Sequence, residues 1–170
     1  MRDYENEFFQ FISQQMDKPY KNKREARQIA ALANQALILE RKKATKEVSD
    51  IWKSGHKKLK EENDKLQIEN NETYHNDIVS ADTHFREAIA MGPPEGTTKA
   101  NWEKGWRYDR QGLLTGARLD RETRVKEITT KWRVGFKALK YDNDEMQKAI
   151  DSAFHSARGE IGAMLADMLE

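Results

Sequence analysis

Apolar residues recur at steps of three and four from the start of the chain, a spacing that predicts helices. In residues 3–16 the apolar side chains that share one helical face are Tyr4, Phe8, Phe11 and Ile12. The pattern ends at Pro19, which cannot continue a helix. So many aromatic groups are not left in water on a free helix. We expect them either to fold back near Leu165 and Met168, or to dock on a partner subunit or a membrane interface.

Two much longer helical patterns follow, separated by one tight turn. Residues 22–91 contain no proline, and a second proline-free stretch runs from Thr97 to the end of the sequence. The turn at 92–96, Gly-Pro-Pro-Glu-Gly, must end the first helix, and Thr97 or Thr98 is suited to cap the second. Such a short connection favours antiparallel neighbours. The predicted fold is therefore all-α, an elongated antiparallel hairpin of two long helices with a short N-terminal amphipathic helix.

This prediction divides the chain into two parts. Residues 1–20 hold the N-terminal helix and a linker, and residues 21–170 form the long helical hairpin. Glycines inside the second long helix weaken it by about 1 kcal/mol each relative to alanine. A break near Gly112 or at 141–144 is therefore the alternative, and it would give a bundle of four or five shorter helices.

Folding the chain about Pro94 gives a register in which large side chains meet small ones. It places Trp52 near Gly135 and Phe136, and Gly55 near Trp132. Large residues opposite small ones are what interdigitating helices require. The predicted hairpin seam is therefore made by Trp52, Gly55, Trp132, Gly135 and Phe136.

Charge supports the same register. Residues 61–96 have a net charge of −7 and would face residues 97–127, with +3. Residues 18–46 have +7 and would face residues 142–170, with −5. Each exposed pair contributes only about 0–1 kcal/mol, but the whole pattern favours the antiparallel arrangement over its alternatives.

One part of the predicted hairpin departs from this balance. Residues 47–60 have a net charge of +2 and would face residues 128–141, with +4. Nothing else in the chain offsets this concentration of positive charge. It forms a candidate basic band that faces DNA or a neighbouring subunit: Lys53, Lys57, Lys58, Lys131, Arg133 and Lys137.

Catalytic and metal-binding motifs do not appear in the sequence. It contains no cysteine, and its four histidines share no metal-ligand spacing. Gly112 to Gly116 lacks the Lys-Ser/Thr of a phosphate-binding loop, and its spacing instead permits close packing of helices. We expect no enzymatic activity, no catalytic or metal site and no cofactor. The sequence also lacks a signal-peptide pattern and a long apolar run, so cytoplasmic synthesis is the default expectation.

The segment Phe85–Gly92 leading into the turn, and the arginine-rich helix leaving it, are similar to the smallest internal virion (ejection) protein of short-tailed bacteriophages. The likeness covers residues 25–150 and includes no signature motif. It implies a protein packed inside the virion that leaves with the genome and assembles into a tube conducting DNA across the host cell envelope. This chain lacks the apolar N-terminal segment of that family, which puts membrane insertion in doubt. No functional residue is carried over.

Two functional hypotheses follow. The first is a structural homo-oligomer, a ring or tube, whose partners are other virion proteins, with non-specific contact to double-stranded DNA and membrane contact left open. Its location would be the virion interior and then the host envelope. The alternative is a small helical module that binds protein or nucleic acid, such as a regulator or a host-defence inhibitor. The two hypotheses differ in stoichiometry, since the second predicts a monomer or dimer.

Overall fold

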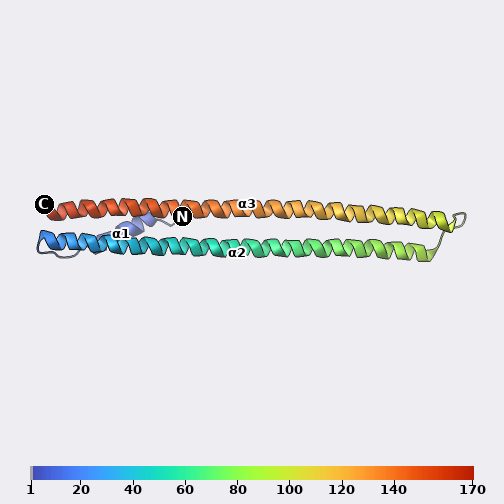
Figure 1. The fold of residues 1–170 in the computed structure, drawn as a ribbon, viewed down its shortest axis with the longest axis horizontal. Coiled ribbons are helices and arrows are strands. Elements are labelled where there is room, and N and C mark those ends of the chain that lie inside the picture. Colours follow the sequence, from blue (N-terminus) through green and yellow to red (C-terminus); the bar gives the residue numbers. More distant parts are fainter. Residues whose placement is uncertain (1) are drawn as a thin grey trace. The chain divides into compact units, whose positions relative to one another are not determined.

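The computed structural model describes residues 2–170, and their regular secondary structure is entirely helical. A short helix, α1 (Tyr4–Met16), precedes two long ones, α2 (Lys23–Met91) and α3 (Lys99–Leu169), as Figure 1 shows. The two long helices pack against each other. The predicted all-α class and the short N-terminal helix are confirmed.

Local signals set where each helix begins and ends. The Asp3 carboxylate caps α1 by accepting a hydrogen bond from the backbone N–H of Asn6 at 3.1 Å. Asn22 caps α2 in the same way, and Thr98 caps α3 by accepting from the N–H of Asn101 at 3.3 Å. Gly92 follows the last residue of α2 with a φ of +76°, a conformation that suits glycine.

Both long helices are continuous. α2 has 69 residues and α3 has 71, and the latter runs through Gly112 and through residues 141–144 without interruption. The alternative of several shorter helices is therefore wrong. Isolated glycines cost a helix about 1 kcal/mol each, which the remaining hydrogen bonds and side-chain packing of so long a helix offset.

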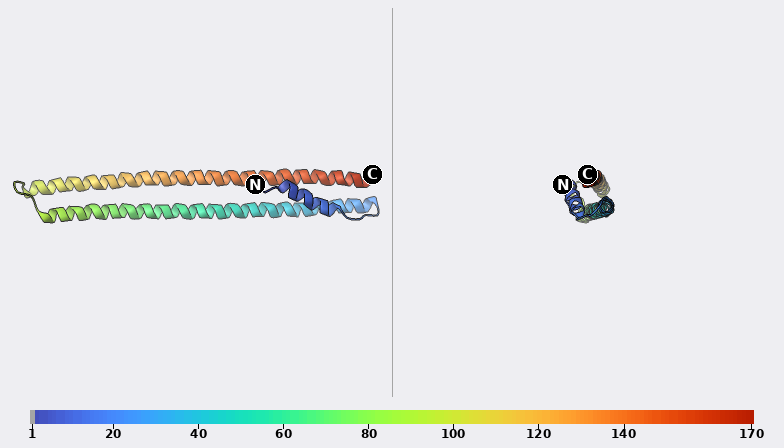
Figure 2. Two further views of the ribbon diagram at one scale, coloured as in Figure 1. Left: turned by 180° about the vertical axis from the view of Figure 1, so that it is seen from behind. Right: turned by 90° about the vertical axis from the view of Figure 1, so that its left-hand side faces the viewer.

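Contacts divide the chain into two compact units. The first contains Met1–His56 with Lys137–Glu170, and the second contains Lys57–Phe136. In the first unit α1 lies alongside parts of both α2 and α3, on which the two views of Figure 2 agree. The second unit contains the connection between the two long helices.

Buried positions recur every 11 residues along each long helix. In α2 the innermost series, buried or half-buried, is Ala26, Leu37, Val48, Leu59, Asn70 and Ala81. In α3 the corresponding series is Trp106, Ala117, Ile128, Leu139, Ile150 and Ile161. Eleven residues make about three turns at ~3.67 residues per turn, so one face stays on the neighbouring helix without the left-handed supercoil of a heptad repeat.

In each unit an ion pair joins the two long helices. In the first unit Arg41 pairs with Asp151 at 2.7 Å. In the second unit Asp82 pairs with Arg110 at 2.6 Å. Both pairs differ from those that folding about Pro94 predicted, where Arg110 would have faced Ile78. Part of the reason is that the connection runs from residue 92 to residue 98, so its middle lies beyond Pro94.

Candidate functional site

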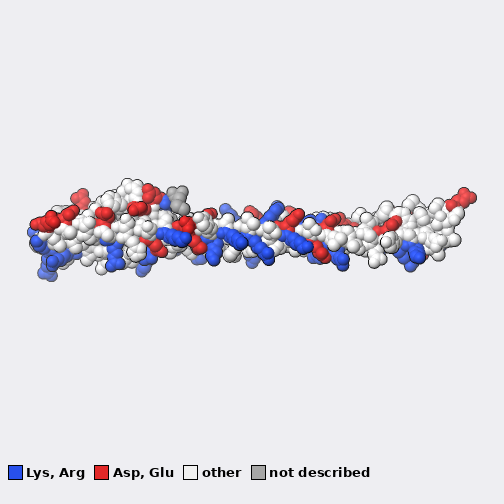
Figure 3. Space-filling model, turned by 90° about the horizontal axis from the view of Figure 1, so that it is seen from above, with Lys and Arg blue, Asp and Glu red and all other residues white. Residues whose placement is uncertain are grey.

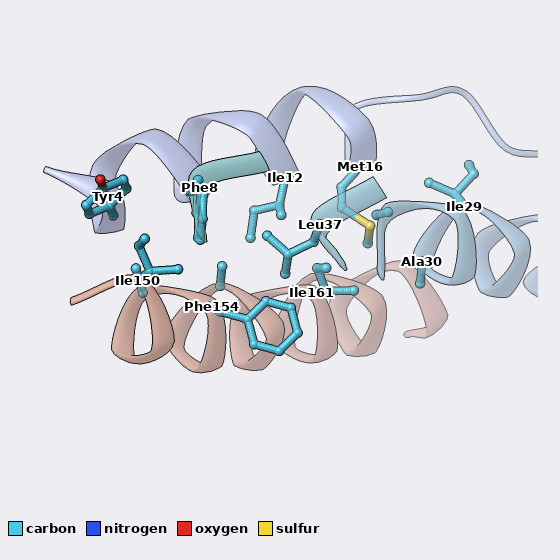
Figure 4. Close-up of a cluster of buried hydrophobic side chains, with 14 of the residues drawn as sticks. Tyr4, Phe8, Ile12, Met16, Ile29, Ala30, Leu37, Ile150, Phe154 and Ile161 are labelled. Atoms are coloured by element: carbon cyan, nitrogen blue, oxygen red, sulfur yellow. The ribbon is translucent and has the colours of Figure 1, made fainter. Parts of the chain in front are cut away.

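The apolar face of α1 is buried against both long helices of the first unit. Tyr4, Phe8 and Ile12 are 4%, 4% and 0% exposed, and Phe11 packs partly against the same cluster. Figure 4 shows Tyr4, Phe8 and Ile12 on the side of α1 that faces α2 and α3, whose side chains in the same cluster include Ile29, Ala30, Leu37, Ile150, Phe154 and Ile161. Leu165 and Met168 pack against this cluster, as the fold-back alternative predicted. These side chains therefore belong to the core of the first unit. They do not form a surface for docking a partner, because their packing against α2 and α3 removes them from solvent.

Polar contacts hold the edges of α1. Arg2 donates to Glu7 at 2.8 Å and to Glu47 of α2 at 2.5 Å, and Ser156 of α3 donates to Glu5 at 3.2 Å. The hydrogen bonds to Glu7 and Glu47 raise the pKa of the Arg2 guanidinium. Burial raises the pKa of the Tyr4 phenol. α1 is thus fixed by an apolar centre and a charged rim.

Two of the predicted seam residues, Gly55 and Gly135, lie where the long helices approach each other closely. A Cβ added to Gly55 would lie 2.7 Å from a methyl carbon of Leu139, and one added to Gly135 would lie 2.7 Å from a methyl carbon of Leu59. Leucines thus stand where the predicted register put Trp132 and Trp52. A branched leucine end fits over a glycine backbone, whereas the wider indole rings are half-buried at the edge of the seam.

The aromatic seam residues stack within their own units. Trp132 stacks on Phe136 with ring centroids 6.2 Å apart, and Trp52 stacks on His56 at 5.9 Å. Both pairs are four residues apart on one helix, the spacing at which helical side chains meet. Each of the four residues is half-buried.

A polar layer interrupts the seam of the second unit. Asn70 is 3% exposed, and its side-chain oxygen accepts from Arg124 Nε at 2.7 Å. Arg124 also lies 3.7 Å from Asp77, and Arg121 donates to Asn71 at 3.0 Å. The amide and the two guanidinium groups are only partly satisfied, since Asn70 Nδ2, Arg121 Nε and one terminal nitrogen of Arg124 are buried without a hydrogen-bond partner. The bonds that do form join particular residues of the two helices, so this layer favours one register.

An open groove lies between the two helices of the second unit. Its volume is about 560 Å³, and its lining includes Asp77, Ala81, His84, Gly112, Gly116 and Asp120. A Cβ placed on Gly112 or Gly116 would meet no atom within 4 Å. The Gly-xxx-Gly spacing was predicted to permit close helix packing, yet no helix among residues 2–170 packs there. The 11-residue repeat, which the sequence reading missed, is the signal that would have placed these glycines at the edge of the seam.

The residues of the candidate basic band are all exposed. Lys53 lies 3.9 Å from Asp50, and Lys57 lies 3.8 Å from Glu61, so each has an acidic neighbour on its own helix. Lys58, Lys131 and Arg133 of the second unit, and Lys137 of the first, form no ion pair within the described part of the chain. Figure 3 shows basic and acidic side chains interspersed on one face, with a largely uncharged stretch beside the α2–α3 connection.

Residues 2–170 lack the groupings that mark a metal site or a membrane-spanning helix. No group of three or more histidine, aspartate or glutamate side chains in this range is placed to hold a metal ion. None of the helices described is both long and apolar enough to cross a membrane. The groove and the exposed apolar and basic faces offer binding chemistry.

No model of a known protein family matches the chain, and no curated protein or solved structure matches it.

Proposed function

We propose that the protein is a structural, oligomer-forming helical protein in which α2 and α3 make one antiparallel hairpin. The contacts inside each unit support this arrangement, since Arg41 pairs with Asp151 in one unit and Asp82 with Arg110 in the other. Within the second unit Asn70 contacts Arg124 and Asp82 contacts Arg110, and within the first unit Lys23 contacts the Leu169 carbonyl and Arg41 contacts Asp151. This order of contacts supports antiparallel neighbours. Two unbroken helices joined by a connection of seven residues, 92–98, are also what a hairpin requires.

The observation that carries the oligomer proposal is the exposure of large apolar side chains on the outward faces of the long helices. Leu39 is 64% exposed, Ile68 58%, Tyr108 80% and Tyr141 65%. A pair of helices buries only one side of each, so apolar groups on the other sides stay in water until another chain covers them. Copies of the same chain are the partners that such repeated faces fit best.

The ring or tube of a phage ejection protein is the assembly that the family resemblance favours. Its lumen must accept DNA without reading its sequence, which requires positive charge facing the phosphates. Lys57, Lys58, Lys131 and Arg133 of the second unit are exposed and supply such charge. We propose these four residues as the contact with duplex DNA.

The test is a measurement of mass and shape. Size-exclusion chromatography with light scattering, followed by electron microscopy, should show a species of many subunits with a ring or tube outline. A monomer or dimer at all concentrations, indifferent to duplex DNA, would instead indicate a small binding module.

Duplex DNA should be retained by the assembly, with an affinity that falls steeply as salt rises. Reversal of the four charges to glutamate should abolish retention while leaving the assembly intact. The matched control reverses four other exposed basic residues of the second unit, Lys99, Lys104, Arg107 and Arg118. Equal loss in both variants would show that net charge, and not this contact, holds the DNA.

A further inference from the structure

In the first unit α1 packs on one face of the 11-residue repeat of α2 and α3. We call this surface the seat of α1. α1 lies over Ala44 and Glu47 of α2 and over Ser156, Ala157 and Glu160 of α3, which line the small hollows along its two edges. Small residues under α1 let its backbone approach, and polar groups at the edges bond to it, as Ser156 does to Glu5. This face therefore accepts a helix.

The groove of the second unit is the repeat equivalent of that seat. Asp77 follows Ala44 by 33 residues, which is three repeats. On α3, Gly112 and Gly116 precede Ser156 and Glu160 by 44 residues, which is four repeats. The faces of the repeat that carry α1 thus also line this groove, although the offset along α3 is one repeat longer than the offset along α2. No helix within residues 2–170 covers the groove.

The chemistry of the groove defines what it accepts. Its floor at Gly112 and Gly116 has open space above it, and Leu113 on its edge is 50% exposed. The charged residues on the rim of the groove are acidic. Asp120 is exposed, and Asp77 forms an ion pair with Arg124 at 3.7 Å. A helix with leucines at its centre and basic residues around them is complementary to such a groove.

The chain itself carries such a helical face, on the outward side of α2 in the first unit. This leucine–basic face consists of Arg24, Leu32, Leu39, Lys43 and Lys46. They follow one another at steps of eight, seven, four and three residues, which place them on one side of the helix. Leu32 is 57% exposed and Leu39 64% exposed. Of the basic members, Lys43 has a carboxylate 3.9 Å away at Glu40, on its own helix.

We propose that the leucine–basic face of one copy seats in the groove of a second copy. The proposal rests on the proposed function and names the contact that builds the oligomer. Because face and groove are different surfaces, a head-to-tail contact leaves each added copy with a free groove or a free face for the next. Repeated in this way, the contact closes into a ring or continues as a helical tube, whereas two copies that exchange it reciprocally would stop at a two-fold dimer.

A cysteine cross-link tests the contact directly, since the natural chain has no cysteine. One copy carries Leu39→Cys and the other Gly116→Cys, and the two are mixed under mild oxidation. We expect a disulfide-linked pair in the mixture and little in either variant alone. The matched control replaces Leu39→Cys with Ile68→Cys, an equally exposed apolar position of α2, 58% exposed. Cross-linking no stronger than in this control would overturn the proposal.

A blocking variant gives an independent reading. Gly116→Leu fills the groove, and the control Gly159→Leu makes the same change at an exposed glycine of the first unit that also has nothing within 4 Å of its Cβ position. Both retain helix content by circular dichroism, since glycine is the weaker helix former. We expect Gly116→Leu to be monomeric where Gly159→Leu assembles like the natural protein.

The outcomes separate the two proposals. Assembly of Gly116→Leu at the natural level would overturn this contact and leave the oligomer proposal standing. Absence of assembly in the natural protein would overturn both. If Gly116→Leu loses its helix content, the cross-link alone decides.

Discussion

Replacing Ile12 with alanine should detach α1 from the long helices. Ile12 is 0% exposed at the centre of the cluster that α1 forms with α2 and α3. The change removes three carbon groups at about 0.8 kcal/mol each, roughly 2.4 kcal/mol in transfer free energy. The cavity left behind adds to this, so we expect a loss of about 3–4 kcal/mol, inside the range of ~2–5 kcal/mol for buried isoleucine.

The loss should appear first in α1. A helix of 13 residues has little stability of its own in water. Amide hydrogen exchange measures the free energy of opening residue by residue. We expect the amides of α1 in Ile12→Ala to exchange faster by a factor of 10² or more, since about 1.4 kcal/mol corresponds to tenfold. Exchange in the second unit should be unchanged.

The control is Phe9→Ala on the same helix. Phe9 is 44% exposed, so its truncation should cost much less, although it removes a larger side chain. If Ile12→Ala loses less than about 1 kcal/mol, or if both variants speed exchange equally, the reasoning that burial of this face anchors α1 is wrong.

Three further outcomes are expected. Gly116→Ala should raise the free energy of unfolding by about 0.5–1 kcal/mol, because the new Cβ enters open space. Gly135→Ala should leave the free energy of unfolding unchanged or lower it, because the new Cβ would lie 2.7 Å from a leucine methyl carbon. Urea unfolding compares the two variants. Asp82→Ala should cost about 1 kcal/mol by leaving the half-buried Arg110 without its 2.6 Å partner, and a double-mutant cycle with Arg110→Ala measures their coupling. Burial raises the pKa of Tyr4, so the folded state holds the phenol proton more tightly than the unfolded state, whose pKa is about 10. Stability from this group is complete below about pH 10 and is lost as pH rises through the higher folded pKa, so the melting temperature should fall less above pH 10 in Tyr4→Phe than in the natural protein.

Much of the fold is predictable from the sequence because the signals are local. The apolar spacing, the cap at Thr98, and the Gly-Pro-Pro turn act within a few residues, so they predict the three helices. The amphipathic face of residues 4–16 also follows from spacing alone. The spacing does not predict what that face packs against, because the same pattern suits an internal core, a partner subunit or a membrane surface.

Only the tertiary structure decided the register and the open groove. Apolar positions that repeat every 11 residues bury similar area in several alignments, so the pattern does not choose among them. Polar contacts favour one alignment instead: Asn70 bonds to Arg124 at 2.7 Å, and Asp82 pairs with Arg110 at 2.6 Å. That alignment places leucines over Gly55 and Gly135 and leaves Gly116 beside an uncovered groove. The difference among these glycines is set by residues distant in the sequence, and side-chain packing alone reveals it.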